Sequence, residues 1–484
     1  MSGFFVSLFL PWLVGVLWLR RLWPGARLPE VLGYGYLVGV LIVTLLLRLW
    51  NLAGLELRFL PIALALSVVA ALSFILGTRP AAPTGTTSMP GPGARERTGT
   101  AAGTSCLWRW ENLVFAFFLG LLAWRFAILV EDNLLRPLFS WDAWMNWAPK
   151  TRVWFELGHL APYVSPQTWL EGASLDGAYT LGNSQAWDYP ITVPLILLWT
   201  ALGLDAWHDD LVKMPWVLCG AALGLGVYGQ LRNLGVSRAL AIVAVYLLLS
   251  IPYLEIHLVL GGYAEIWLAT ALCFGLLAFL RWRETRNPAD LVLALTFAAF
   301  CLLIKKPGVI WGTLLALAIV VEVLPRWVLM MIAAGVAAVV ALIFVAGGVS
   351  FSLPVMGDFR LAADGITLPY LGSQPWHFTD VSAPLVDSLF FSTNWHLSWY
   401  AAVALLAAGI FTGRVHRKDV GPLFFLVATL GTFLLIFFFI PRYSREALKL
   451  VTLNRAMLQL VPSIFVFMVW WFYAPQQRSV QTER

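Results

Sequence analysis

Three acidic side chains lie beside apolar, membrane-length segments and could remove a proton from a hydroxyl group. Asp142 lies in the stretch SWDAWMNWAPKTRVWFELGHL, Asp188 lies in WDYPITVPLILLW, and Glu265 lies in LGGYAEIWLAT. Apolar surroundings raise the basicity of a carboxylate, so each group is a candidate general base, with Asp142 first. Each also has a simpler interpretation. Asp142 could cap a helix, Asp188 could belong to a turn into a membrane helix, and Glu265 could be favoured by a helix dipole.

Five basic side chains could bind an anion near the same surface. Lys305 and Lys306 lie in LLIKKPGVIWG, between two apolar segments, and Arg442, Arg445 and Arg455 lie in RYSREALKLVTLNRAMLQLVP. Arginine can grip two phosphate oxygens at once. Cations on the non-cytoplasmic side go against the positive-inside tendency, so an anionic lipid phosphate is a suitable partner. Snorkelling of the lysines and a surface cationic helix are the simpler interpretations.

Aromatic side chains surround the acidic candidates and could line a substrate site. They are Trp141, Trp144, Tyr189 and Tyr263. At helical spacing, Trp144, Trp147 and Trp154 share roughly one face. The sequence therefore predicts an amphipathic helix that lies on the membrane, with Asp142 near its start.

The composition places the chain in a lipid bilayer. Of its 484 residues, 60% are hydrophobic and 12% are charged, whereas a soluble domain carries about 25% charged residues. The net charge of +6 comes mostly from arginines at the ends of apolar segments, which is a topology signal and not a nucleic-acid signal. The four cysteines have neither the spacing of a zinc site nor that of a disulfide framework.

The apolar segments predict an all-α polytopic membrane protein with thirteen spans, near residues 3–19, 31–47, 59–77, 112–130, 212–230, 238–256, 264–280, 290–304, 308–324, 327–347, 397–412, 420–440 and 456–473. One alternating path puts most arginine-bearing loops on the cytoplasmic side. It requires residues 191–204 to lie in the outer interface or to dip in and out.

The same path divides the chain into four parts. Residues 1–77 form an N-terminal three-span segment, and 78–106, rich in Gly, Pro, Thr and Ala, are expected to be a disordered cytoplasmic linker. Residues 107–474 form the main body, with external loops 131–190 and 348–396. Residues 475–484 form a cytoplasmic tail. Large loops on a rigid scaffold tend to carry function, so the outer face is the expected site of chemistry.

These motifs, in this order, resemble the GT-C superfamily of membrane glycosyltransferases, which includes protein O-mannosyltransferases and aminoarabinose transferases. The similarity covers about residues 112–471. It rests on Asp142 in the first external loop, the prolines of Tyr189–Leu195, Lys213-Met214-Pro215, Glu265, the KKPG turn and LNRAMLQLVP. The first loop reads WDAW where a metal-binding acidic pair would have two acids, so no metal or other cofactor is expected.

The resemblance implies a fold like that of the superfamily and an inverting transfer of sugar. The donor would be a polyprenyl-phosphate-linked sugar, and the acceptor a glycan, lipid or protein at the outer face, as in a bacterial inner membrane. Asp142 would be the general base, with Glu265 and then Asp188 in reserve. The basic residues would stabilise the leaving phosphate.

Three other classes of protein remain open. A transporter or flippase for lipid-linked saccharides could use the same charged and aromatic surface, but it should place ionisable groups near the membrane midplane. A polysaccharide polymerase or ligase also joins lipid-linked sugars. A non-catalytic assembly subunit is the third. Charges that cluster at one end of the spans favour the enzyme.

Overall fold

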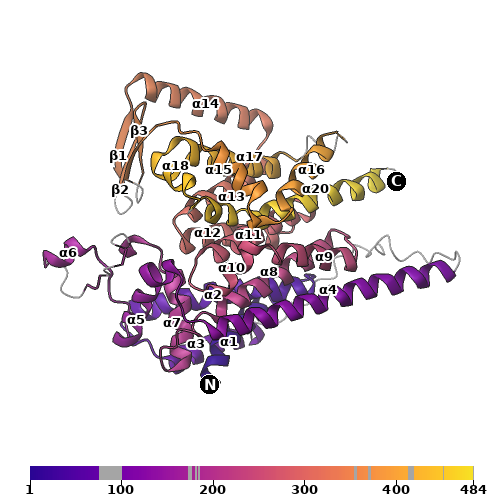
Figure 1. The fold of residues 1–484 in the computed structure, drawn as a ribbon, viewed down its shortest axis with the longest axis horizontal. Coiled ribbons are helices and arrows are strands. Elements are labelled where there is room, and N and C mark those ends of the chain that lie inside the picture. Colours follow the sequence, from indigo (N-terminus) through magenta and orange to yellow (C-terminus); the bar gives the residue numbers. More distant parts are fainter. Residues whose placement is uncertain are drawn as a thin grey trace.

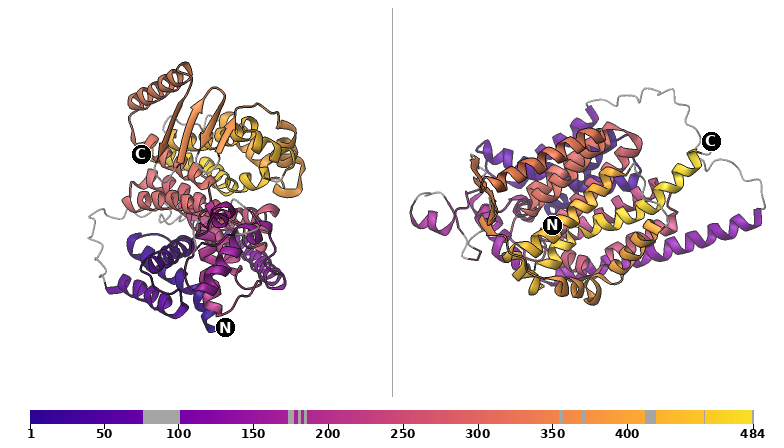
Figure 2. Two further views of the ribbon diagram at one scale, coloured as in Figure 1. Left: turned by 90° about the vertical axis from the view of Figure 1, so that its left-hand side faces the viewer. Right: turned by 90° about the horizontal axis from the view of Figure 1, so that it is seen from above.

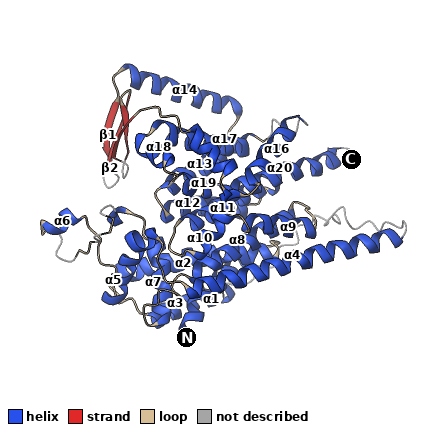
Figure 3. Ribbon diagram, viewed as in Figure 1, coloured by secondary structure: helices blue, strands red, loops and turns tan. Residues whose placement is uncertain are grey.

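The protein is built almost entirely of helices, with one small sheet at its edge (Figures 1 and 3). The computed structural model describes residues 1–75, 101–172, 177–179, 182–183, 186–353, 357–368, 372–411, 419–450 and 452–482. Most of the predicted linker 78–106 lies outside these residues, and its last part, 101–106, begins a long helix. The predicted tail 475–484 is the continuation of the last helix as far as Thr482.

Seven helices in the described part of the chain are long and apolar enough to cross a membrane, and a bent pair could make an eighth span. The seven are α1 (Ser2–Leu22), α2 (Leu28–Leu52), α4 (Ala101–Leu135), α8 (Met214–Asn233), α11 (Glu265–Thr285), α14 (Arg326–Val345) and α17 (Val420–Phe439). These helices define a membrane-embedded, mainly helical protein.

Five of the other predicted spans correspond to shorter apolar helices. They are α3 (Phe59–Ile75), α12 (Pro288–Ile304), α13 (Pro307–Val323), α16 (Ser398–Phe411) and the apolar part, Val461–Trp471, of α20 (Val461–Thr482). A helix of 17 residues is about 26 Å long, which falls short of the roughly 30 Å apolar layer of a bilayer. The prediction of thirteen crossings is therefore not confirmed, although a helix lies at each predicted position.

One predicted span, 238–256, is broken. The chain forms α9 (Arg238–Leu249) and then α10 (Pro252–Val259), which are bent by 68° relative to each other. Pro252 opens α10, and proline disfavours helical backbone in the residue before it, which explains the break. The bend brings the end of α10 and the following glycine turn back to the start of α11.

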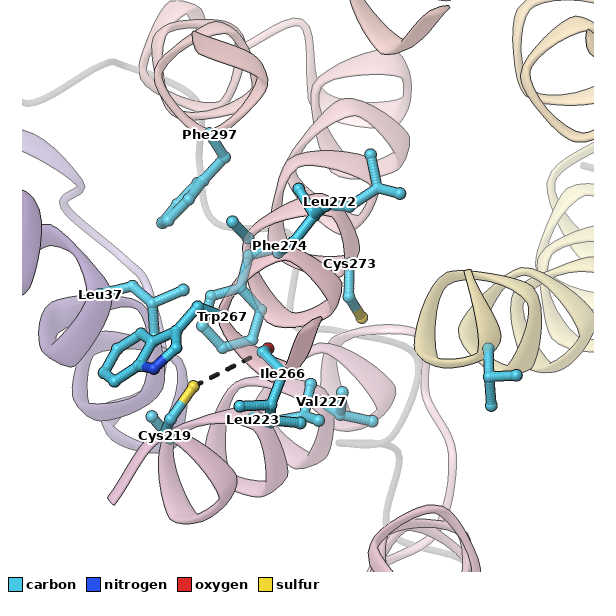
Figure 4. Close-up of a cluster of buried hydrophobic side chains, with 14 of the residues drawn as sticks. Leu37, Cys219, Leu223, Val227, Ile266, Trp267, Leu272, Cys273, Phe274 and Phe297 are labelled. Atoms are coloured by element: carbon cyan, nitrogen blue, oxygen red, sulfur yellow. Dashed lines mark hydrogen bonds between the residues drawn. The ribbon is translucent and has the colours of Figure 1, made fainter. Parts of the chain in front are cut away.

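The core lies around α11, whose residues are almost all buried. Figure 4 shows Phe274 of α11 between side chains of α2, α8 and α12, with Leu37, Leu223 and Phe297 nearby. The ring of Phe274 stacks on Tyr34 at 4.2 Å between centroids. Close packing of aromatic rings from four helices makes α11 the rigid element against which charged side chains at its two ends are held.

The N-terminal helices are fixed to the body by buried polar contacts at the far end of α11. Arg281 lies 2.9 Å from Glu30 of α2, and the Trp23 indole donates to Asp290 at 2.5 Å. Arg283 bonds Asp419 at 2.6 Å. Sixteen residues of α11 separate Glu265 from Arg281, a rise of about 24 Å. The candidate acidic residues and the predicted cytoplasmic arginines therefore lie at opposite ends of one helix.

Residues 192–204 form α7 (Thr192–Leu204), and nearly all of this helix is buried. It packs against α1, α2 and α3 and against α5 (Ala148–Leu157). The prediction had this stretch lie in the outer interface or dip in and out, and the structure shows that protein covers it, between the N-terminal helices and the first loop. The sequence could not show that neighbour, because an apolar helix looks the same whether lipid or protein covers it.

The second predicted external loop, 348–396, contains a sheet that the sequence analysis did not predict. Strands β1 (Val349–Leu353), β2 (Gly357–Ala362), β3 (Gly365–Leu368) and β4 (Gly372–Pro375) pair antiparallel in the order β1-β2-β3-β4. The rings of Phe351 and Phe359 stack across the first pair at 5.1 Å. The sheet and α14 lie on the opposite side of the molecule from the N-terminal helices (Figure 2).

Candidate functional site: a cluster of carboxylates and cations

Asp142, Glu265 and Arg455 meet at the start of α11 (Glu265–Thr285), although they are far apart in the sequence. The Arg455 guanidinium contacts Glu265 through Nε, which lies 2.8 Å from Oε1, and through Nη2 at 2.5 Å. It also contacts Asp142, through Nη1 to Oδ1 at 3.2 Å and through the shared Nη2 to Oδ2. One arginine therefore joins the two first candidates for a general base.

Lys305 and Lys306 form the turn between α12 and α13, and both point into the same region. Lys305 Nζ lies 2.6 Å from Glu265 Oε1 and 3.7 Å from Asp142 Oδ2. Lys306 Nζ lies 2.5 Å from Asp188 Oδ2. The extended backbone of Lys305 ends α12 and Pro307 begins α13, so adjacent lysines reach different carboxylates. The alternative that the lysines snorkel to the interface does not describe either side chain here.

The carboxylates lie deeper than the cations. The side chains of Asp142 and Glu265 are 5% and 0% exposed, whereas those of Lys305 and Arg455 are 14% and 20% exposed. A group that approaches from the solvent therefore meets positive charge first. Burial without a partner would be costly for any of these ions, and the mutual pairing offsets that cost.

Asp142 precedes a π-helical turn, η1 (Ala143–Trp147), and its carboxylate turns to Arg455 and not to the backbone N–H groups of that turn. The N-cap interpretation is therefore wrong. The prediction that Trp144, Trp147 and Trp154 share one membrane-facing side is also wrong, because Trp147 and Trp154 are buried and Trp144 is exposed. A π turn has a wider repeat than the α-helix on which the spacing argument relied.

Two glycines allow the loop before α11 to approach Asp142 closely. Gly262 has φ +100, and a Cβ on it would lie 2.4 Å from the Cβ of Ala143. A Cβ on Gly261 would lie 2.3 Å from the Cβ of Lys213. Ser140 Oγ donates to the Gly261 carbonyl at 2.8 Å. The sequence LGGYAE therefore brings the start of α11 against the start of η1.

We expect Gly262→Ala to lower the free energy of unfolding and to reduce activity, because the new methyl group would separate η1 from α11. A strained left-handed backbone costs about 1–3 kcal/mol, and the clash with Ala143 adds to it. Gly54→Ala is the matched control, since Gly54 has φ +70 and nothing within 4 Å. Equal shifts in thermal unfolding for the two variants would show that contact with η1 is unimportant.

Aromatic rings lie against the cations of the cluster. The ring of Tyr263 is 4.8 Å from the Arg455 guanidinium carbon, and the ring of Tyr189 is 4.7 Å from Lys306 Nζ. Trp147 packs against Tyr189, with ring centroids 5.4 Å apart. Burial raises the pKa of both tyrosines, so they remain neutral near neutral pH. Trp141, the remaining aromatic candidate, is exposed, as Trp144 is.

The arginines of the last predicted motif are split between two helices. Arg442 and Arg445 lie on α18 (Pro441–Leu448), and Arg455 lies on α19 (Leu453–Leu458). Arg442 is exposed and acts electrostatically on Tyr189. Arg445 is exposed and makes no ion pair within the part of the chain that the structure describes. Of the three, Arg455 forms the ion pairs with Asp142 and Glu265.

The sequence analysis missed two buried polar residues beside the cluster. Lys150 of α5 is fully buried, and its Nζ donates to the Ala186 carbonyl at 2.5 Å, two residues before Asp188. His257 of α10 packs between Tyr253 and Tyr263, and its Nε2 has no hydrogen-bond partner among the described residues. The signal for Lys150 was available, since a lysine three residues after one buried tryptophan and four before another lies on an apolar helix face.

We expect Lys150 to make stability depend on pH between about 8 and 10. Burial lowers its pKa to about 8, whereas an unfolded lysine titrates near 10.4. Below pH 8 the lysine is charged in both the folded and the unfolded protein, so folding bears the full cost of burying the charge. Above it the unfolded chain holds more protons, so stability rises with pH. The change in the free energy of unfolding that Lys150→Met causes should therefore be more favourable at pH 7 than at pH 10, by up to about 3 kcal/mol.

Denaturant unfolding of the wild type and the variant at pH 7, 8, 9 and 10 measures this difference. Lys449→Met provides the control, because Lys449 is exposed. If the Lys150→Met and wild-type profiles run parallel from pH 7 to 10, Lys150 does not titrate in this range.

The described residues contain no group of three His, Cys, Asp or Glu side chains placed to hold a metal ion. The three carboxylates of the cluster are instead bound to Lys305, Lys306 and Arg455. This arrangement can accept a proton at a carboxylate and can offer three cations to an anionic ligand.

Comparisons with protein-family models, with curated proteins and with solved structures find no match to this chain. The fold and the cluster therefore define its class as a membrane-embedded helical protein with paired charges at one end of its central helix. Further assignment depends on the chemistry of the cluster.

Proposed function

We propose that the protein is an integral-membrane glycosyltransferase that transfers a sugar from a polyprenyl-phosphate donor to an acceptor hydroxyl. The supporting observation is the layered cluster, in which Lys305 and Arg455 lie nearer the surface than the carboxylates of Asp142 and Glu265. A phosphate needs the cations, and an acceptor hydroxyl needs a base next to them. A polyprenyl chain in the bilayer would hold its phosphate at the ends of the helices, where this cluster lies.

The reaction would be a single displacement at the anomeric carbon. The carboxylate of Asp142 takes the proton of the acceptor hydroxyl as that oxygen forms a bond to the anomeric carbon. The bond from this carbon to the phosphate oxygen breaks, and its electron pair leaves with the polyprenyl phosphate. Attack from the side opposite the leaving group inverts the anomeric centre. Negative charge grows on the phosphate in the transition state, where fixed cations lower the barrier most.

Asp142 is preferred to Glu265 as the base because of how each is held. Glu265 is fully buried at the start of α11 and bonds both Lys305 and Arg455. Its role is to position those two cations. Asp188 does the same for Lys306. Asp142 belongs to the first loop, and its side chain is 5% exposed where that of Glu265 is fully buried.

A transporter or flippase for the same lipid is the second candidate, and one observation favours it. Arg125, within α4, forms an ion pair with Glu255 on α10, and a bend separates α10 from α9. Ionisable groups inside membrane helices and broken helices are common in transporters. A polymerase or ligase of lipid-linked saccharides would be a variant of the first proposal.

Transfer by the purified protein tests the proposal. Radiolabelled polyprenyl-phosphate sugars of several kinds are incubated with the protein in nanodiscs and a membrane extract of the source cells as acceptor. We expect label from at least one donor to leave the lipid, with release of an equal amount of polyprenyl phosphate. Intact donors throughout, together with faster transbilayer movement of the same lipids in proteoliposomes, would support the transporter instead.

We further propose that the cluster faces outward, as in a bacterial inner membrane. In a chain whose four cysteines are replaced by serine, an impermeant thiol reagent on intact cells should label Glu171→Cys and spare Arg95→Cys. If the reagent labelled Arg95→Cys and spared Glu171→Cys, the cluster would face the cytoplasm.

A further inference from the structure

All three nitrogens of the Arg455 guanidinium contact carboxylates. Nε and Nη2 lie 2.8 and 2.5 Å from Glu265 Oε1, and Nη1 and Nη2 bond the two oxygens of Asp142. Both oxygens of Asp142 therefore accept from one planar cation. In this state both oxygens are engaged with the cation and not with an acceptor hydroxyl.

Each carboxylate of the cluster already has a cationic partner. The carboxylates of Asp142, Asp188 and Glu265 are paired with Lys305, Lys306 and Arg455. A donor phosphate adds a negative charge and needs N–H donors that the carboxylates now occupy. A phosphate that binds Arg455 must therefore draw this cation away from a carboxylate, and an unpaired buried charge is costly.

The contacts indicate which carboxylate gives way. Glu265 has a second close cation, since Lys305 Nζ lies 2.6 Å from its Oε1. Asp142 has Arg455 as its close partner, with Lys305 Nζ at 3.7 Å. Arg455 can also move while the ring of Tyr263 and the carboxylate of Glu265 still hold it. Nε stays bonded to Glu265 when the Nη1 end of the guanidinium turns from Asp142 to a phosphate, and Lys305 Nζ remains 3.7 Å from Asp142.

We infer that Arg455 exchanges partners, leaving Asp142 for the donor phosphate, so that donor binding itself turns Asp142 into an active base. This inference rests on the proposed function and adds an order to it, since the acceptor can be deprotonated only after the donor is bound. No additional residue or cofactor is required.

The exchange predicts an effect of unusual sign. Asp142→Asn, which removes the competing charge, should bind polyprenyl monophosphate about tenfold or more tightly than the wild type does, the size expected for one charge-assisted contact. Asp142→Asn would also strengthen binding if it only removed a repulsion between the Asp142 carboxylate and the phosphate. The two causes differ in an Arg455→Gln background, where repulsion persists but competition for Arg455 is gone.

The experiment is equilibrium binding of radiolabelled polyprenyl monophosphate to the full chain in nanodiscs. The wild type, Asp142→Asn, Arg455→Gln and the double variant are compared. Asp364→Asn is the control, because Asp364 pairs with Arg360 on the exposed sheet. We expect the gain from Asp142→Asn to shrink to less than about twofold in the Arg455→Gln background. An equal gain in both backgrounds, or no gain in either, overturns the exchange.

Two further outcomes keep the inference separate from the proposed function. If the wild type and Arg455→Gln bind polyprenyl monophosphate equally well, Arg455 does not bind the phosphate and the exchange is wrong, whereas the donor class stands. If neither protein binds it, the lipid-phosphate donor itself is wrong. If Asp142→Asn does not fold, infrared difference spectra of the wild type replace it. With 13C at the aspartate carboxyl carbons, the exchange predicts that added polyprenyl monophosphate shifts a carboxylate band, and an unchanged spectrum contradicts it.

Discussion

Replacing Asp142 with asparagine is expected to lower sugar transfer by about 10²–10⁴-fold while the protein still folds, because a lost general base typically costs that much. Asparagine keeps the size of the side chain and can still accept a hydrogen bond from Arg455, but it cannot take the acceptor proton at neutral pH. The measurement is transfer by the purified variant with the active donor, next to its thermal unfolding.

Asp364→Asn gives the matched control for this variant, since it removes a carboxylate that pairs with an arginine far from the cluster. It should transfer sugar as the wild type does. Near-wild-type turnover by a folded Asp142→Asn protein would remove Asp142 from the mechanism. Glu265→Gln, and after it Asp188→Asn, would then be the next variants to measure.

The helices were the most predictable part of this molecule. Apolar runs broken by arginine, glycine and proline gave a helix at each expected place, since hydrophobic length and breakers are local properties of the chain. What surrounds each helix is not local. The sequence of α7 is as apolar as that of α14, yet α7 is buried by protein whereas the side chains of α14 remain uncovered.

The predictions that differ from the structure do so for separate physical reasons. Pro252 breaks a span that composition alone would make continuous, and the π turn after Asp142 shifts the tryptophans from the faces that an α-helix would give them. The strands at 349–375 were missed because four short segments inside a loop carry little periodic signal. Burial of Lys150 could be read from spacing, whereas its partner, the Ala186 carbonyl, could not.

The site was predicted as a set of residues and not as a set of contacts. Asp142, Glu265, Lys305 and Arg455 were each placed near the same end of the helices, because charged residues at the ends of apolar segments lie at a similar depth. Which carboxylate pairs with which cation depends on helix rotation and on the glycine turn before α11. For this reason the sequence could not show that Arg455 holds the two candidate bases together.

The second large effect is expected at Arg455. Arg455→Lys should lower transfer clearly, and Arg455→Ala should lower it further, by about 1.5–3 kcal/mol in transition-state stabilisation, which is roughly 10–150-fold in rate. Lysine keeps the charge, but its ammonium group lacks the planar fork that now reaches both Asp142 and Glu265. Kinetics over a range of donor concentrations separate the effect on donor affinity from the effect on turnover.

Loss of Arg455 also affects the folded state, because Asp142 and Glu265 would then share Lys305 as their remaining nearby cation. Removal of one member of a buried ion pair costs about 3–5 kcal/mol, so thermal unfolding must accompany the kinetics. Arg360→Ala, which breaks an exposed pair with Asp364, should change neither measurement. If a folded Arg455→Ala protein kept its donor affinity and its rate, Arg455 would only join η1 to α11. The phosphate would then have to be bound by Lys305 and Lys306.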